Sequence, residues 1–226
     1  MENLSSAAPA RQYAWTVGAS RGDPPYRILT ERLLIRCWDP RDAPLLKEAI
    51  DSSLDHLRPW AHWAHGEPTP LEDKVQLLRG FRGRFDLGVD FAYGIFAPDE
   101  SEVLGGTGLH VRVGDDALEI GYWIRASRIG EGLALEVASA LTRVAFAVCG
   151  VDRLEIHVEP ANEVSSRIPR RLGFVEEGRL RRRLPAPEGE APRDAIIFTM
   201  LAEEFTASAL VDFPLEAYDS ADSRVP

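Results

Sequence analysis

The chain has 226 residues, of which 45% are hydrophobic and 27% are charged, as in an ordinary soluble globular protein. No apolar run approaches the roughly 20 residues that a membrane-spanning helix needs, and the N-terminus lacks the apolar stretch of a secretory signal. The formal net charge of −10 argues against a general nucleic-acid binder, because phosphate contacts need a basic surface. The charge is compatible with a cationic substrate, although solubility alone also explains it.

Two cysteines, Cys37 and Cys149, fit neither a metal-site spacing nor a redox pair. We therefore expect reduced thiols, a cytoplasmic protein and no bound metal. Residues 1–25 lack periodicity and are expected to form a flexible N-terminal arm, and residues 206–226 are expected to form a C-terminal tail. Between them, residues 26–205 predict one domain without a linker or repeat.

The first half of the domain begins with a strand at residues 33–37. Asp39 then caps a helix whose first position is Pro40, where the missing N–H has no consequence. A Trp-rich stretch at residues 57–65 is expected to be irregular. The run that starts at Thr69 reads as a capping box and predicts a helix start there.

The second half alternates strands and helices. Strands are expected at about residues 91–96, 103–113, 118–124, 154–159, 174–183 and 195–201, and helices at residues 131–149 and after Asn162. Turn residues at 114–116 predict that the second and third of these strands form an antiparallel hairpin. The order predicts a mixed sheet covered by helices.

A glycine pair precedes the longest predicted helix. The strand that contains Glu119 leads into Gly130-x-Gly132, and the helix follows at once. Glycines without side chains allow backbone N–H groups to approach a ligand, and the first helical turn offers unpaired donors and a positive dipole end. Together they favour an anion site suited to a pyrophosphate. A glycine-rich turn without a ligand has the same pattern, so the pair alone is a weak signal.

A second motif, Asn162-x-x-Ser165 followed by Leu172-Gly173-Phe174, comes after a predicted strand. With it, the chain resembles the GNAT acetyltransferase superfamily and, within it, the RimJ/RimL-like group. The other residues that carry the resemblance are Thr30-Glu31-Arg32-Leu33 with Leu34 and Arg36, Leu57-Arg58-Pro59-Trp60, Glu119-Ile120-Gly121-Tyr122-Trp123, Glu136, Glu177-Gly178 and Arg181. The resemblance covers residues 27–204. It implies the α/β (α+β) GNAT fold, with a mixed, mostly antiparallel sheet of six to seven strands flanked by helices.

The resemblance also implies a donor site for acetyl-CoA. The expected cofactor-binding residues are Tyr122, Trp123, Ile124, Ser127, Arg128, Ile129, Gly130, Glu131, Gly132, Leu133, Ala134, Asn162 and Ser165. Ser127 stands where relatives usually have Gln or Arg, and Arg125 or Arg128 could supply that charge. Pro169 stands where many relatives carry a tyrosine acid, which excludes that acid at this position. A proline there also predicts a short or bent helix.

For catalysis, the resemblance implies direct attack of a neutral amine on the thioester, with a backbone N–H near Tyr122 or Trp123 steadying the carbonyl oxygen. Glu119 is the expected base, directly or through a water; the alternatives are a solvated strand residue or a carboxylate that orients the substrate. Ser165 could relay a proton to the leaving sulfur, or it could cap the helix that Asn162 starts.

Three further residues are candidates for the acceptor site. Trp60 and Trp63 either shape an acceptor pocket or belong to the core of an irregular loop. His157 either lines the cleft or is a surface or packing residue. The arginines at 179, 181, 182 and 183 form a basic strand that is expected to be a solvated face.

These signals favour an N-acetyltransferase that acts on a protein N-terminus or a small, possibly cationic, amine. The alternatives are a transferase for a larger acyl-CoA such as succinyl-CoA, or a non-catalytic acyl-CoA-binding module. A dinucleotide-binding protein is less well supported, because no GxGxxG follows an early strand. We expect no direct nucleic-acid or membrane partner, and a homodimer is compatible with the resemblance.

Overall fold

A ten-stranded sheet runs through the protein. The computed structural model describes residues 22–186 and 189–225, and the expected N-terminal arm therefore lies largely outside the described residues. The strand order is β10-β9-β1-β2-β3-β4-β5-β6-β8-β7, and β5 and β6 are the parallel neighbours in an otherwise antiparallel sheet. The strands are β1 (Arg27–Leu29), β2 (Leu34–Cys37), β3 (Phe91–Phe96), β4 (Val103–His110), β5 (Ala117–Ile124), β6 (Arg153–Val158), β7 (Val175–Leu184), β8 (Arg193–Leu201), β9 (Glu216–Tyr218) and β10 (Arg224–Val225).

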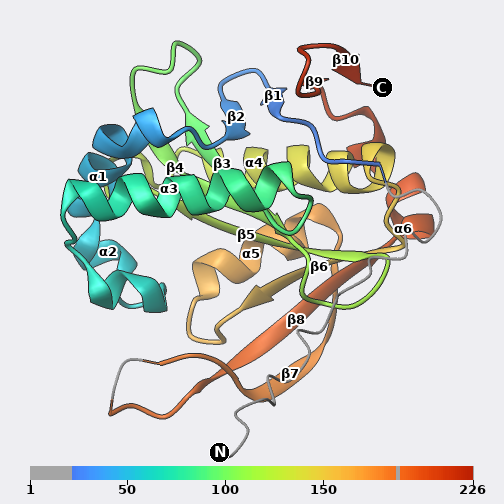
Figure 1. Cartoon of the computed structure of the whole chain (residues 1–226). Coiled ribbons are helices and arrows are strands. Elements are labelled where there is room, and N and C mark those ends of the chain that lie inside the picture. Colours follow the sequence, from blue (N-terminus) through green and yellow to red (C-terminus); the bar gives the residue numbers. More distant parts are fainter. Residues whose placement is uncertain (1–21, 187–188, 226) are drawn as a thin grey trace, which may run out of the picture.

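Helices surround the sheet, and β7 and β8 form a long hairpin at one end of it (Figure 1). The α-helices are α1 (Ala43–Asp51), α2 (Leu54–Leu57), α3 (Leu71–Asp86), α4 (Leu133–Arg143), α5 (Glu163–Leu172) and α6 (Ala202–Thr206). Short 3-10 turns lie at η1 (Pro40–Asp42), η2 (His62–Gly66), η3 (Ala126–Arg128) and η5 (Ala209–Asp212), and α4 continues into the π-helical turn η4 (Val144–Val148). Among the described helices, none has the length and apolar character needed to cross a bilayer.

Both faces of the sheet are buried at its central strands. Along β3, Tyr93 and Ile95 pack in a cluster with α4, whereas Ala92 and Phe96 pack in a second cluster with α1. Alternate side chains of a strand point to opposite faces, so each cluster covers one face. The expected mixed sheet flanked by helices and the hairpin of β4 and β5 are confirmed.

The expected number of six to seven strands is wrong. The sheet gains β1, β9 and β10, and β9 pairs with β1 so that Ala217 lies opposite Ile28. Residues 206–226, expected as a tail without periodicity, thus supply two strands and the buried Leu210. Strands of two or three residues are too short for an alternation to be recognised in the sequence, because neighbouring strands rather than their own pattern define them.

The two predicted helix starts differ in their outcome. The Asp39 carboxylate accepts a hydrogen bond from the Arg41 N–H and takes part in a capping box, as expected, but it caps η1 rather than α1. The capping box expected at Thr69 does not form, although α3 does begin at Leu71. The Thr69 hydroxyl instead donates to the Glu67 carboxylate.

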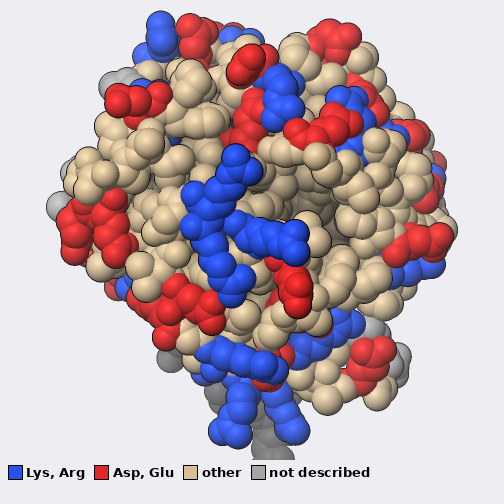
Figure 2. All heavy atoms as spheres, turned by 180° about the vertical axis from the view of Figure 1, so that it is seen from behind, with Lys and Arg blue, Asp and Glu red and all other residues tan. Residues whose placement is uncertain are grey.

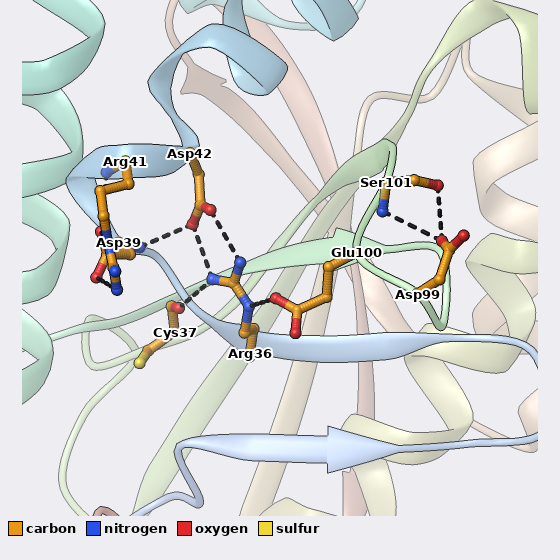
Figure 3. A network of polar contacts seen from close by, with 8 residues as sticks. All are labelled: Arg36, Cys37, Asp39, Arg41, Asp42, Asp99, Glu100 and Ser101. Carbon is orange, nitrogen blue, oxygen red and sulfur yellow. Dashed lines mark hydrogen bonds and ion pairs between the residues drawn. The ribbon is translucent and has the colours of Figure 1, made fainter.

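Arg36, one of the residues that carry the family resemblance, joins three segments (Figure 3). Its guanidinium donates two hydrogen bonds to the Asp42 carboxylate, at 2.8 and 2.9 Å, and one to Glu100 at 2.6 Å. Asp42 also accepts from the backbone N–H of Asp39. This network fixes η1 and the turn between β3 and β4 to β2.

Candidate active site

Strands β5 and β6 run parallel for three residue pairs and then part. The register joins residues 117–119 of β5 with residues 153–155 of β6. Beyond Glu119, β5 continues to Ile124 against β4, while β6 continues to Val158 against β8. Within the described chain, the facing edges of the two strands are not paired there. Unpaired N–H and C=O groups of a strand edge can bind an extended ligand as an added strand would, so the opening fits an elongated arm.

The loop between β5 and α4 lies beside this opening. Gly130 and Gly132 both have a φ of +80°, which disfavours residues with a side chain. A Cβ at Gly130 would meet no atom within 4 Å, so the backbone conformation and not crowding requires glycine there. Gly132 is the N-cap of α4, and no side chain caps the helix. The first-turn N–H groups and the helix dipole therefore remain available to an anion such as a diphosphate.

Glu119 lies at the point where the strands part, and it is only 5% exposed. Its carboxylate accepts two hydrogen bonds from Arg112, at 2.7 and 2.5 Å, and lies 3.6 Å from Nδ1 of His157. Burial raises the pKa of Glu119, but the hydrogen bonds from Arg112 and the charges of His157 and Arg112 outweigh it, so the pKa is lowered. The carboxylate is therefore a fixed negative charge at neutral pH, and the alternative of a solvated strand residue is wrong.

Two histidines flank this carboxylate. Nε2 of His157 lies 2.6 Å from Glu155, so this ring is held between two acidic side chains and is part of the polar cluster. His110 lies opposite Glu119 in the β4–β5 register, and its Nδ1 is 2.9 Å from Asp90. The contacts with Glu155 and Asp90 therefore restrain the His157 and His110 rings beside the opening.

On the other side of the opening, α5 approaches β5. The Asn162 side-chain oxygen accepts from the Ser165 N–H at 3.1 Å, so Asn162 caps α5. The Ser165 hydroxyl does not cap the helix, since it lies 3.1 Å from the Tyr122 hydroxyl. Burial raises the pKa of Tyr122 to about 12, although its hydrogen bond with Ser165 acts in the opposite direction. Pro169 is accommodated within a ten-residue helix, which is therefore not short.

The Trp-rich segment stands at the side of the opening nearest Trp123. Trp60 and Trp63 are 42% and 44% exposed, so neither is a core residue. The Trp63 ring meets the Trp123 ring edge to face, with centroids 5.8 Å apart. Arg193 of β8 donates to the Pro59 carbonyl at 2.6 Å, which ties the segment to the strand next to β6. Aromatic surface is therefore available beside the strand that lines the opening.

The face opposite that of Figure 1 is hollowed near its middle, and a run of basic side chains borders the hollow on one side (Figure 2). Acidic side chains are scattered around the rest of this face. The four arginines expected to be solvated on β7 are exposed, and Arg179 pairs with Asp194 at 2.9 Å. The basic strand is therefore compatible with the expected solvated face.

Residues 32–175, more than half of the chain, match the profile of the acetyltransferase (GNAT) domain family. The chain belongs to the GNAT acetyltransferase family. The opening between β5 and β6 and the glycine loop are thus the candidate donor site of a GNAT domain, and the expected family and fold are confirmed.

Similar proteins include N-acetyltransferases of ribosomal proteins and the RimJ and RimL structures. The chain is 29% identical over 160 residues to the [ribosomal protein uS5]-alanine N-acetyltransferase of Escherichia coli strain K12, which covers 69% of this chain and 81% of the relative. The structure of Mycobacterium smegmatis RimJ in complex with CoA-disulfide is 26% identical and has a TM-score of 0.68, covering 82% of this chain and 90% of RimJ. A third relative is RimL, a ribosomal L7/L12 α-N-protein acetyltransferase, whose structure was solved in complex with coenzyme A. It is 22% identical and has a TM-score of 0.68, and the match covers 77% of this chain and 97% of RimL. At this identity, the likeness shows the shared fold.

The motif at residues 30–33 of this GNAT domain holds the loop that contains Gly130 and Gly132. Glu136 in the first turn of α4 accepts from the Thr30 hydroxyl at 2.6 Å and from Nε of Arg32 at 2.7 Å. Arg32 also donates to the backbone carbonyl of Glu131, between the two glycines, at 2.9 Å. Sequence reasoning noted these residues but assigned them no role. They join the first strands to the loop and thereby position its amides.

The charge expected from Arg125 is not offered to a ligand. The Arg125 side chain is 8% exposed and pairs with Glu48 at 2.7 Å and Glu102 at 3.0 Å, so it anchors the loop to α1. Arg128 is 35% exposed and pairs with Glu102 and Glu131, both at 2.9 Å. The two ion pairs restrain Arg128 at the surface of the loop.

The GNAT domain brings Glu119, His157 and Tyr122 to one opening, with Ser165 facing Tyr122 across it. Arg112 was missed by sequence reasoning, although a signal was present. The β4–β5 register pairs residue 110 with residue 119, so an extension of the hairpin sets residue 112 diagonally opposite Glu119 on the same face.

Proposed function

We propose that this protein transfers an acetyl group from acetyl-CoA to the primary amine of a protein N-terminus. One observation carries the proposal: β5 and β6 part beside a helix start whose two positive-φ glycines leave its first amides open. An elongated donor with a diphosphate at one end and a thioester at the other fits these two features together. Glycine at positions 130 and 132 suits a cradle of backbone amides, since a side chain would disturb it.

The chemistry of the transfer needs two kinds of charge stabilisation. When the amine lone pair attacks the thioester carbon, negative charge develops on the carbonyl oxygen and positive charge on the nitrogen. The free edge of β5 near Tyr122 and Trp123 offers backbone N–H groups to the oxygen. The fixed charge of Glu119 stabilises the nitrogen, and a proton leaves it through a water. The lowered pKa of Glu119 makes it a weak direct base but a permanent anion, which favours the role of an orienting carboxylate.

A protein N-terminus is supported as the acceptor by two observations. Relatives are named for alanine or α-N-protein acetylation of ribosomal proteins. In addition, the exposed rings of Trp60 and Trp63 offer a surface to the first side chains of a peptide. A small amine would leave much of this aromatic surface uncovered.

The proposal is tested by following release of the CoA thiol with acetyl-CoA and short peptides that begin with Ala, Ser or Met. Release that depends on the peptide, together with a mass increase of one acetyl group at its N-terminus, is expected. The matched control is the same peptide with its N-terminus already acetylated, which should give only background hydrolysis. Absence of amine-dependent release with all peptides and with a panel of small amines would overturn the proposal.

The same assay separates the two alternatives. With one good acceptor, acetyl-CoA should be turned over faster than succinyl-CoA at equal concentration; the reverse order would identify a larger acyl donor. A non-catalytic module would bind acetyl-CoA in calorimetry but release no thiol with any amine.

Glu119→Gln provides a residue-level prediction. Gln keeps the size but removes the charge, so we expect kcat/KM for the peptide to fall by about 100-fold, as for the loss of one electrostatic contact in a transition state. Binding of CoA, measured by calorimetry, should stay within about two-fold, because the diphosphate loop is elsewhere.

The pH profile adds a check on this role. Because the pKa of Glu119 lies below its usual 4.5, the carboxylate is ionised throughout the range from about pH 6 to about pH 9. A rise of activity with pH in that range therefore does not come from ionisation of Glu119, and it should persist in Glu119→Gln. Glu176→Gln, a surface carboxylate on β7, is the control and should resemble the wild type. Loss of the rise in Glu119→Gln alone would contradict the orienting role.

A further inference from the structure

Two hydroxyl groups meet across the opening between β5 and α5. Oη of Tyr122 lies 3.1 Å from Oγ of Ser165 and 3.4 Å from the Ser165 backbone carbonyl oxygen. Tyr122 belongs to the part of β5 that has left β6, and Ser165 is in the first turn of α5. The pair is therefore a direct side-chain contact between the two walls of the proposed donor site.

Pro169 leaves the Ser165 carbonyl open to the Tyr122 hydroxyl. In an α-helix, residue 169 would donate its N–H to the carbonyl of Ser165, but proline has no N–H. The Ser165 carbonyl thus lacks its usual helical partner, and the Tyr122 hydroxyl is the group beside it. The Ser165 N–H is in turn held by Asn162. Ser165 is therefore restrained at its N–H by the cap, and its two oxygens share the single proton of the Tyr122 phenol, with Oγ the nearer of the two.

We propose that Tyr122 is a positioning residue that directs the Ser165 hydroxyl proton toward the leaving sulfur. This inference rests on the proposed acetyl transfer. In that reaction the amine nitrogen forms a bond to the carbonyl carbon, the C–S bond breaks, and its electron pair stays on sulfur. The Ser165 O–H donates a hydrogen bond to the thiolate while the Tyr122 O–H donates to Ser165 Oγ. The nitrogen gives its surplus proton to water, and the released thiolate takes one from solvent.

The direction of the two hydrogen bonds follows from charge. A hydroxyl that accepts a hydrogen bond is a better donor, because linked hydrogen bonds polarise one another. A thiolate draws the Ser165 O–H toward the sulfur. The Tyr122 O–H then donates its hydrogen bond to Ser165 Oγ. Burial raises the pKa of Tyr122 to about 12, so the phenol remains protonated and donates without ionising. The pair thus stabilises the thiolate by hydrogen bonding and not by complete proton transfer.

A kinetic double-mutant cycle tests the role of Tyr122. In Tyr122→Phe we expect kcat to fall about ten-fold with KM for acetyl-CoA within about two-fold, because the backbone and the ring remain. Ser165→Ala should lose at least as much. The double variant should be no slower than Ser165→Ala, since Tyr122 acts only through Ser165. A wild-type kcat in Tyr122→Phe, or losses that multiply in the double variant, would overturn the inference.

Titration of bound CoA tests the same contact without any acceptor. The ultraviolet absorbance of the thiolate gives the pKa of the CoA thiol in the complex. We expect this pKa to be higher by about one unit in Tyr122→Phe and in Ser165→Ala than in the wild type, with no further increase in the double variant. Equal thiol pKa values in wild type and Tyr122→Phe would overturn the inference.

A matched control is Tyr93→Phe on β3. Its hydroxyl is also hydrogen-bonded, to the Pro25 carbonyl at 2.9 Å, but it is fully buried and outside the opening. This variant should lose thermal stability and keep the wild-type kcat and thiol pKa. If the wild type binds CoA and shows the expected thiol titration but acetylates no amine, the proposed acceptor chemistry fails while the hydroxyl pair stands. If the wild type acetylates peptides and Tyr122→Phe does so equally well, only the present inference fails.

Discussion

Acetyl-CoA affinity is expected to fall by about 100-fold or more when valine replaces both Gly130 and Gly132. Each strained backbone position costs about 1–3 kcal/mol, and about 1.4 kcal/mol corresponds to a ten-fold loss of affinity. A β-branched residue is a strong outlier at the φ of +80° that both positions adopt. The altered loop would relax in the free protein and would have to be forced back around the diphosphate. Calorimetric titration with acetyl-CoA measures the loss directly.

Gly150 provides the matched control for this prediction. It has a φ of +66°, and an added Cβ would meet no atom within 4 Å, as at Gly130. It lies beyond the opposite end of the same helical run, after η4. Gly150→Val should therefore introduce a similar backbone strain and lower the melting temperature, while the affinity for acetyl-CoA stays unchanged. Unchanged affinity in the double variant Gly130→Val/Gly132→Val would contradict the donor site.

The largest loss of stability is expected from Lys74→Met. The Lys74 ammonium on α3 is 1% exposed and is paired with the Glu67 carboxylate, whose side chain is 9% exposed. The other Glu67 oxygen accepts from the Thr69 N–H at 2.8 Å, and the Glu67 carbonyl accepts from Arg58 at 2.9 Å. Glu67 therefore closes the Trp-rich segment onto α3. Removing one partner leaves a buried charge, which costs about 3–5 kcal/mol.

Thermal unfolding measures this effect. For a chain of this length, a loss of that size lowers the melting temperature by about 10 °C. Lys47→Met is the control, because the Lys47–Asp51 pair lies in the same region but its side chains are 30% and 34% exposed. Exposed pairs contribute only about 0–1 kcal/mol, so this variant should melt within about 3 °C of the wild type. Similar melting temperatures for the two variants would contradict a structural role for the buried pair.

The consequences for the site follow from the position of this pair. Because Glu67 ends the segment that carries Trp60 and Trp63, loosening it should disturb the proposed acceptor side before the proposed donor side. In Lys74→Met at a temperature where the protein is still folded, KM for a peptide should rise more than KM for acetyl-CoA. This order follows from the separate anchoring of the glycine loop by Arg32 and Arg125.

Local sequence patterns determined much of the proposed donor side. The glycine pair before a long amphipathic run predicted an open helix start, and the loop has that conformation in the protein. Asn162 was recognised as a helix start, and it caps α5. These features depend on residues close together in the chain, where side-chain periodicity and cap chemistry act directly. The order of the seven strands from β2 to β8 was predictable for the same reason.

The chemistry of the opening was decided only by the tertiary structure. The sequence named Glu119 and Ser165 but did not reveal that Arg112 holds the former and Tyr122 the latter. The pairing of β9 with β1 was likewise hidden. Each of these contacts joins groups from different elements, so it depends on strand register and helix packing. The shifted pKa values have the same origin: the contacts with Arg112 and His157 lower the pKa of Glu119, and burial raises that of Tyr122, and neither effect exists before the chain has folded.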